Sequence, residues 1–276
     1  MFHLRYGRAN FLLEIGMIAF TIAFVFPVYL LLTLSFKPQN EVAESPLSLP
    51  DSFYTSNYAQ AWSEGSLGSA MISSVVITIL SVVSLVLLGS LASYVLARRQ
   101  TRLSYGLYLL FLLGITIPIQ IAVIPLYQLA RDLNLLGTYT SMIAYYTGIL
   151  LPFTIFLYTG FLRTLPRGYE EAALVDGASH LQAFTRVVFP LLRPVTGTVI
   201  ILTAIGIWND FFTPLLFLAG TDQQTLPVAI FSFVGEYVAH WGAVFAGLVI
   251  AAAPILIIFF LFQRYIIKGF ASGLKG

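Results

Sequence analysis

The stretch Met71–Ala97 reads MISSVVITILSVVSLVLLGSLASYVLA and contains no charged residue. A helix needs about 20 mainly apolar residues to cross the hydrocarbon core of a bilayer. The apolar residues are continuous rather than alternating, and this excludes the strand pattern of a membrane β-barrel. The stretch is also too long for a buried strand of a soluble core. It therefore predicts a transmembrane helix.

Five further windows have the same character, and together with the first they predict an all-α integral membrane protein with six transmembrane helices. The window nearest the N-terminus follows a basic start, as a signal peptide would. Its apolar run is longer than the 7–15 residues of a signal-peptide core, so we expect an uncleaved span. The five windows are Phe11–Phe36, Leu103–Leu129, Met142–Leu162, Val195–Ala219 and Ala243–Phe262.

The overall composition agrees with a membrane protein. Hydrophobic residues make up 58% of the chain, charged residues 9%, and the mean hydropathy is +0.89. Soluble domains carry about 25% charged residues, so lipid must replace water around much of this surface. The chain has no cysteine, which excludes disulfides and thiolate chemistry. The net charge of +2 and the lack of a basic sequence run give no reason to expect nucleic acid.

Lysine and arginine predict the orientation in the cell membrane. With the N-terminus inside, only Lys37 and Arg131 of the 14 basic residues fall outside, which satisfies the positive-inside rule. Both termini are therefore expected in the cytoplasm. The predicted division is a cytoplasmic N-terminus 1–10, a first span 11–36, an extracytoplasmic loop 37–68, a core 69–264 with five spans and a cytoplasmic loop 164–194, and a cytoplasmic tail 265–276.

The stretch Arg163–Pro194 is the only predicted inside loop long enough to carry its own structure. Glu170 and Glu171 lie where a helix would begin, and the helix dipole favours acidic residues there. Asp176 followed by Gly177 predicts a turn, because glycine readily takes the left-handed conformation that ends a helix. The loop is therefore predicted to begin with a short helix and a tight turn.

A second helix is predicted directly after this turn. Ser179 with Gln182 three residues later forms a capping-box pattern, and we expect the helix to run until Pro190. From these features alone, two interpretations stay open. The hairpin rests on the membrane surface, or it docks into the groove of a cytoplasmic partner.

The residues of this loop resemble a known motif. Glu171-Ala172-Ala173, Asp176-Gly177-Ala178 and Phe189-Pro190 resemble the EAA loop of binding-protein-dependent ABC importer permeases. Other stretches are similar to the sugar-importer branch, specifically its maltose-type chain, and they cover nearly the whole sequence in the family's order. They are Leu34–Lys37 (LSFK), Asn57-Tyr58, Ser90–Arg98 (SLASYVLAR), Ile124–Tyr127 (IPLY), Trp208–Phe211 (WNDF), Gln263–Tyr265 and Gly273–Gly276 (GLKG).

The resemblance implies a type I ABC importer permease fold in which the loop is a helix-turn-helix that couples to an ATPase. It implies three kinds of protein partner: a second homologous permease chain, two ATP-binding subunits and an extracytoplasmic solute-binding protein. Membrane lipid, the further partner, is expected from the composition. The cargo would be a sugar, an oligosaccharide or a related polyol. Glu171 would anchor the docked loop and Gly177 would form the bend. The implied coupling residues are Glu170, Glu171, Ala172, Ala173, Asp176, Gly177 and Ala178.

The chain itself shows no sign of enzymatic chemistry. A phosphate-binding P-loop needs Gly-Lys followed by Ser or Thr, and no lysine of this chain has that context. ATP and Mg²⁺ are therefore expected on a partner ATPase, with no cofactor, metal or catalytic residue on this chain. The lysines are Lys37, Lys268 and Lys275, and the histidines, too scattered for a metal site, are His3, His180 and His240.

Asp210 is the only acidic residue well inside a predicted span, beside Trp208 and Asn209. Burying an ionisable group in a membrane is costly, so such a residue is a candidate for function. These three residues are candidates for the translocation pathway. Asp210 could equally form a structural hydrogen bond to a neighbouring helix. An ion-coupled secondary transporter is the alternative class, but it would normally need more buried ionisable groups, and the EAA-like loop favours the importer.

Overall fold

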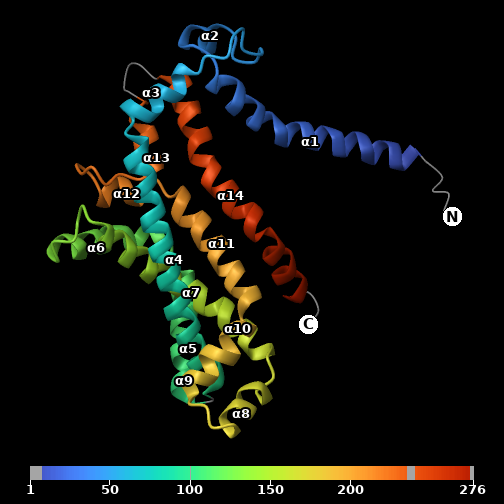
Figure 1. Cartoon of the computed structure of the whole chain (residues 1–276), viewed down its shortest axis with the longest axis vertical. Coiled ribbons are helices and arrows are strands. Elements are labelled where there is room, and N and C mark those ends of the chain that lie inside the picture. The colour runs from blue at the N-terminus through green and yellow to red at the C-terminus, as the bar shows by residue number, and fades with distance from the viewer. Residues whose placement is uncertain (1–7, 100, 235–239, 274–276) are drawn as a thin grey trace. The chain divides into compact units, whose positions relative to one another are not determined.

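A computed structural model describes residues 8–99, 101–234 and 240–273 (Figure 1). The chain divides into two compact units. Unit 1 comprises the described parts of Met1–Gly68 and Ala229–Ala252, and unit 2 those of Ser69–Val228 and Ala253–Gly276. Three helices have residues in both units: α4 (Leu67–Arg98), α13 (Leu226–Phe231) and α14 (Trp241–Gly273).

Unit 1 begins with α1 (Arg8–Ser35), followed by the shorter helices α2 (Gln39–Glu44) and α3 (Ser56–Glu64). Every side chain from residue 10 to residue 28 is exposed, although nearly all of them are apolar. A helix that is apolar on all sides is stable only when its surroundings are apolar. The first predicted window is therefore a helix whose surface suits lipid or an apolar partner.

A polar cluster follows α1 in unit 1. Asn57 donates through Nδ2 to the carbonyls of Ser35 (2.9 Å) and Lys37 (2.8 Å), and the hydroxyls of Ser35 and Tyr58 lie 2.8 Å apart. A Cβ atom on Gly242 would lie 2.5 Å from Asn57 Nδ2, so the start of α14 requires glycine there. The cluster joins the LSFK and Asn57-Tyr58 stretches that the sequence analysis found separately.

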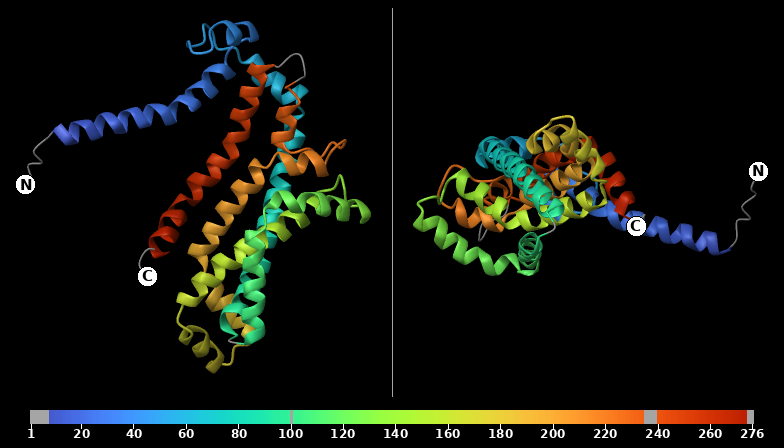
Figure 2. Two further views of the ribbon diagram at one scale, coloured as in Figure 1. Left: turned by 180° about the vertical axis from the view of Figure 1, so that it is seen from behind. Right: turned by 90° about the horizontal axis from the view of Figure 1, so that it is seen from below.

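Unit 2 contains most of the remaining helices. α5 and α11 both pack along α7 (Figure 1 and Figure 2), because buried side chains such as Ile155, Tyr158 and Val199 fill the space between neighbouring helices. The helices are α5 (Arg102–Thr116), α6 (Ile119–Asp132), α7 (Tyr139–Thr164), α8 (Gly168–Val175), α9 (His180–Ala183), the π-helical turn η1 (Phe184–Val188), α10 (Phe189–Leu191), α11 (Arg193–Asn209) and α12 (Phe212–Phe217).

The third predicted window, Leu103–Leu129, is two helices rather than one continuous helix. The helix path bends by 102° between α5 and α6. Ile117 is extended (φ −77°, ψ 120°) because a residue before proline is pushed out of the helical region, and Pro118 has no N–H to continue the hydrogen-bond ladder. The apolar pattern did not reveal this bend.

The fifth window, Val195–Ala219, is interrupted as well. α11 ends at Asn209, Asp210 is extended (φ −70°, ψ 122°), and α12 begins two residues later. In a continuous helix, the ring of Pro214 would collide with the carbonyl of Asp210 four residues earlier. Asp210 therefore lies at a break between helices, and its predicted place inside an unbroken span is wrong.

Among the described residues, three unbroken helices are long and apolar enough to cross a membrane, and they cover 10–35, 67–98 and 139–164. Counting two bent pairs, 102–132 and 180–209, raises the number to five. A shorter apolar helix, Trp241–Ile257, overlaps most of the last predicted window, Ala243–Phe262. The protein is therefore an all-α integral membrane protein, as the sequence predicted.

Candidate functional site

The predicted helix-turn-helix is present in unit 2 as the α8–α10 hairpin, which comprises residues Gly168–Leu191 (Figure 1). Gly177 has φ +88° and ends α8. Ala178 N donates to Ala173 O (3.0 Å) and Gly177 N to Leu174 O (3.1 Å), the bonding of a glycine-terminated helix. The predicted left-handed turn at Gly177 is confirmed.

The second arm of the hairpin begins with the predicted capping box. Ser179 N donates to Gln182 Oε1 (2.8 Å), and Gln182 N donates to Ser179 Oγ (3.3 Å). The prediction was that this helix runs until Pro190. In the structure it ends one residue later, at Leu191. A π turn precedes the proline, with Phe189 N donating to Phe184 O, and this wider register relieves the clash of the proline ring with the preceding turn.

The inner face of the hairpin packs on the rest of unit 2. Ala183 and Phe184 are buried, and the Phe184 ring lies 5.0 Å from the ring of Tyr94 on α4. The same apolar cluster includes Tyr158 and Leu162 of α7. Burial of this face holds the hairpin against the ends of α4 and α7.

An ion pair strengthens this attachment. Arg98, the last residue of α4, places Nε 2.7 Å from Glu170 Oε1, and the two side chains are only 13% and 9% exposed. The guanidinium group also donates to Leu162 O (3.0 Å) and to Leu165 O (3.4 Å), the carbonyls of a residue in the last turn of α7 and of the residue that follows the helix. One arginine therefore joins α4, α7 and α8.

The two neighbouring acids of the loop have different environments. Glu170 is buried against Arg98, whereas Glu171 is exposed. Ala172 is exposed too, and Ala173 and Ala178 are half-buried. The outer face of the hairpin also carries exposed Asp176 and three exposed apolar side chains: Tyr169 (55%), Val175 (87%) and Leu181 (64%). An exposed surface that combines acids with large apolar groups suits a protein partner.

The side chains of Trp208, Asn209 and Asp210, the three candidates for the translocation pathway, have different surroundings. Asp210 accepts a hydrogen bond from the Tyr146 hydroxyl on α7 (3.0 Å) and another from Thr213 N (3.3 Å). Asn209 is exposed and donates to Ile205 O on its own helix (2.9 Å), while Trp208 is buried. The carboxylate thus holds the break between α11 and α12 against α7.

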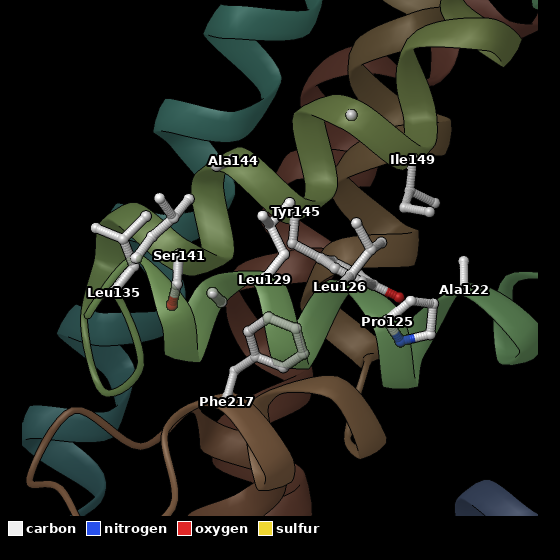
Figure 3. A pocket seen from close by; sticks show the side chains of 13 residues that line it. Ala122, Pro125, Leu126, Leu129, Leu135, Ser141, Ala144, Tyr145, Ile149 and Phe217 are labelled. Atoms are coloured by element: carbon white, nitrogen blue, oxygen red, sulfur yellow. The ribbon is translucent and has the colours of Figure 1, made fainter.

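An apolar cavity of about 650 Å³ lies beside this break, between α6, α7 and α12. Figure 3 shows the Phe217 ring facing the side chains of Leu126 and Leu129 across it. Tyr145 lines the cavity and contacts the ring of Tyr146, the partner of Asp210, edge to face at 5.4 Å. Within the described residues, no group of three or more His, Asp or Glu side chains is placed to hold a metal.

Comparison with known proteins gives consistent matches. Residues 85–272 match the family model of the "binding-protein-dependent transport system inner membrane component". The melibiose/raffinose/stachyose import permease protein MelC of Bacillus subtilis is 38% identical over 248 residues, covering 90% of each chain. The diacetylchitobiose uptake system permease protein NgcG of Streptomyces coelicolor is 33% identical and covers 93% of this chain and 86% of its own.

The fold has a close match among solved structures. A chain of a bacterial ABC transporter involved in the import of the acidic polysaccharide alginate superposes with a TM-score of 0.84 at 21% identity, covering 96% of this chain and 99% of its own. The inward-facing MetNI methionine ABC transporter matches with a TM-score of 0.58. On the family match and the identity to MelC and NgcG, the chain belongs to the family of binding-protein-dependent transport system inner membrane components.

Proposed function

We propose that this chain is the permease subunit of an ABC importer that moves a sugar, an oligosaccharide or a related polyol across the cell membrane. The observation that carries the proposal is its full-length similarity to MelC, whose name records import of melibiose, raffinose and stachyose. Relatives named for diacetylchitobiose and for starch degradation products share the same carbohydrate character. The comparisons lend no support to the alternative of an ion-coupled secondary transporter.

The family implies a solute-binding protein and an ATPase as partners. We further propose that a second homologous permease chain and two ATP-binding subunits complete the complex. The basic residues favour an orientation with both termini in the cytoplasm. ATP and Mg²⁺ would be bound by the ATPase subunits, since no lysine of this chain has a P-loop context, and this chain would carry no catalytic residue.

The α8–α10 hairpin is the proposed docking element for an ATP-binding subunit. Its inner face is buried on α4 and α7. A movement of the ATP-binding subunit that displaces the hairpin would therefore be transmitted to these membrane helices through packed side chains. Its outer face offers Glu171 and Asp176 among exposed apolar groups. Under this proposal Ala172, Ala173 and Ala178 permit close approach, Gly177 sets the bend, and Glu170 acts inside the chain through Arg98.

Trp208, Asn209 and Asp210 are proposed to mark the translocation pathway. A break in a membrane helix exposes backbone groups that must bond to something other than lipid, and such breaks are tolerated where they face protein or a water-filled cavity. Asp210 supports the break by bonding to Tyr146 and to Thr213. Asn209, the exposed member, is proposed to contact the solute.

Glu171→Gln is expected to reduce recovery of the ATP-binding subunit in co-purification by about tenfold, while the purified membrane chain stays folded. Loss of a charged contact at a protein interface costs about 1–3 kcal/mol, and 1.4 kcal/mol corresponds to a factor of ten. Glu44→Gln, which removes an exposed acid from unit 1, is the matched control and should leave recovery unchanged. Equal recovery of the ATP-binding subunit with both variants would show that Glu171 does not contribute to the docking surface.

Uptake by the reconstituted complex tests the function as a whole. Proteoliposomes that contain both permeases, the ATPase and the binding protein should accumulate labelled raffinose only with ATP on the ATPase side. Dissipating ion gradients with an ionophore should have no effect. Asp210→Asn should keep uptake within about threefold, because the amide oxygen can accept from Thr213 N while the amide NH2 donates to the Tyr146 hydroxyl, which can act as an acceptor. Uptake by this chain alone, driven by an ion gradient and lost in Asp210→Asn, would establish the secondary transporter instead.

A further inference from the structure

Five arginines from two separate short stretches of the sequence meet around one pocket of unit 2. The pocket has a volume of about 630 Å³ and lies where the end of α4, the start of α5 and the end of α7 come together. Tyr105 and Leu165 complete much of its wall. The arginines are Arg98, Arg99, Arg102, Arg163 and Arg167.

The pocket carries uncompensated positive charge. No acidic residue lines it, and only Arg98 forms an ion pair with another described residue, Glu170. Arg163 stacks over the ring of Tyr108 at 4.6 Å, and Arg167 donates to the carbonyl of Arg98 at 3.3 Å. These contacts orient the cations but leave their charge in place. A concave site with charge of one sign concentrates ligands of the opposite sign.

The pocket lies at the ends of apolar helices. Arg98 is the last residue of α4, Arg163 lies in the last turn of α7, and Arg102 is the first residue of α5. Ends of membrane helices meet the phosphate headgroups, and basic pockets between helices at this depth suit anionic headgroups. Arg102 is the first residue of α5, where the helix dipole disfavours a cation, so the position of this arginine is not explained by the stability of the helix.

An apolar stripe continues from the pocket along α5. Leu103, Leu110 and Leu113 are 71%, 62% and 60% exposed. With Gly106 they have the three- and four-residue spacing of one helix face. A Cβ atom on Gly106 would have no heavy atom within 4 Å, so the stripe contains a shallow open notch. A cationic pocket followed by an apolar stripe matches a phosphate group attached to an acyl chain, and neither a soluble phosphate nor an acidic protein surface needs the stripe.

We propose that this pocket binds the phosphate headgroup of an anionic phospholipid, whose acyl chain lies along α5. The arginines supply the charge. Arg99 and Arg102 are exposed, whereas Arg163 and Arg167 are also held by contacts with Tyr108 and with the carbonyl of Arg98, so the first two are proposed to contact the headgroup most directly. Because Arg98 belongs both to the pocket and to the ion pair with Glu170, a bound lipid braces the site where the α8–α10 hairpin is attached. The proposal does not depend on the identity of the transported solute.

Native mass spectrometry of the full-length chain in detergent tests the proposal. The probes are dioleoylphosphatidylglycerol, dioleoylphosphatidylcholine and glycerol 3-phosphate. Wild type should retain phosphatidylglycerol about tenfold more than phosphatidylcholine, and Arg99→Gln/Arg102→Gln should abolish most of this preference, because each basic residue near an anionic headgroup contributes substantially to binding. Arg99→Lys/Arg102→Lys should keep most of it, since the attraction depends mainly on charge.

Arg186→Gln/Arg193→Gln is the matched control, because it removes two exposed arginines that do not line the pocket. It should bind phosphatidylglycerol like wild type. Equal loss in the control and in the pocket variant would reduce the effect to overall charge and overturn the proposal. Displacement of the lipid by equimolar glycerol 3-phosphate would assign the pocket to a soluble phosphate. Unchanged lipid binding with lost recovery of the ATP-binding subunit would assign it to that protein.

Discussion

Replacing Arg98 by methionine is expected to destabilise the chain by about 3–5 kcal/mol and to abolish solute-stimulated ATP hydrolysis by the assembled importer. The variant leaves the carboxylate of Glu170 buried without its cation, which is more costly than never having had the pair. It also removes the donor to the carbonyls of Leu162 and Leu165 at the end of α7. Thermal unfolding of the detergent-purified chain gives the first quantity, and ATPase assays of the complex give the second.

The double variant Arg98→Met/Glu170→Leu separates stability from coupling. Replacing both members of a buried ion pair by apolar residues is often nearly neutral for stability. We therefore expect the melting temperature to return close to the wild-type value. ATP hydrolysis should stay unresponsive to solute, because the apolar pair lacks both the ion pair of Arg98 with α8 and its hydrogen bonds to the carbonyls at the end of α7.

Arg186→Met, at an exposed arginine of the hairpin, is the control for loss of positive charge and should change neither quantity strongly. If the double variant recovers solute-stimulated hydrolysis together with stability, the pair is only a structural support. If Arg98→Met itself retains both, the ion pair contributes nothing to the attachment of the hairpin.

The Arg98–Glu170 pair marks the limit of what the sequence predicted. The turn at Gly177 and the capping box at Ser179 and Gln182 depend on neighbouring residues, so their local pattern was sufficient. The partner of Glu170 is far away in the chain, and nothing in the spacing relates the two. Helix-start preference applied equally to Glu170 and Glu171, and only the family resemblance singled out Glu171; burial now separates the two into an internal and an external position.

The two helix breaks show a different limit. Hydropathy measures how apolar a segment is, not whether its backbone is continuous, so the third and fifth windows appeared as single spans. Pro118 and Pro214 were visible in the sequence, but Pro27 and Pro152 stay inside unbroken helices. A proline therefore did not by itself identify which span would break. The breaks are identified in the structure by the extended backbone of Ile117 and of Asp210.

Unit 1 shows the same dependence on long-range contacts. Lys37, the first residue of the predicted outside loop, is fully buried, and its Nζ donates to Ser48 Oγ at 2.9 Å. Its carbonyl accepts from Asn57. In the sequence, the LSFK and Asn57-Tyr58 stretches are separate similarities to a family. Only the fold shows that they form one polar cluster, which holds the segment after α1 in place.

Gly177→Val is expected to reduce solute-stimulated ATP hydrolysis by tenfold or more while leaving the melting temperature of the membrane chain nearly unchanged. A φ of +88° is strained for any residue with a Cβ, by about 1–3 kcal/mol for ordinary side chains and more for β-branched ones. The turn is exposed and a Cβ there would have no heavy atom within 4 Å. The strain therefore acts on the hairpin geometry rather than on packing.

A graded series at this position makes the cause testable. Asn tolerates the left-handed region better than other residues with a side chain, so Gly177→Asn should retain most activity, Gly177→Ala less, and Gly177→Val least. Gly168→Val, in the same hairpin, is the matched control, because Gly168 has no positive φ and equally open surroundings. It should behave like wild type. An order that follows side-chain size rather than tolerance of positive φ, with Asn worse than Ala, would mean that the ATPase fills the space at Gly177. Equal activity throughout would mean that the docked hairpin does not use this turn.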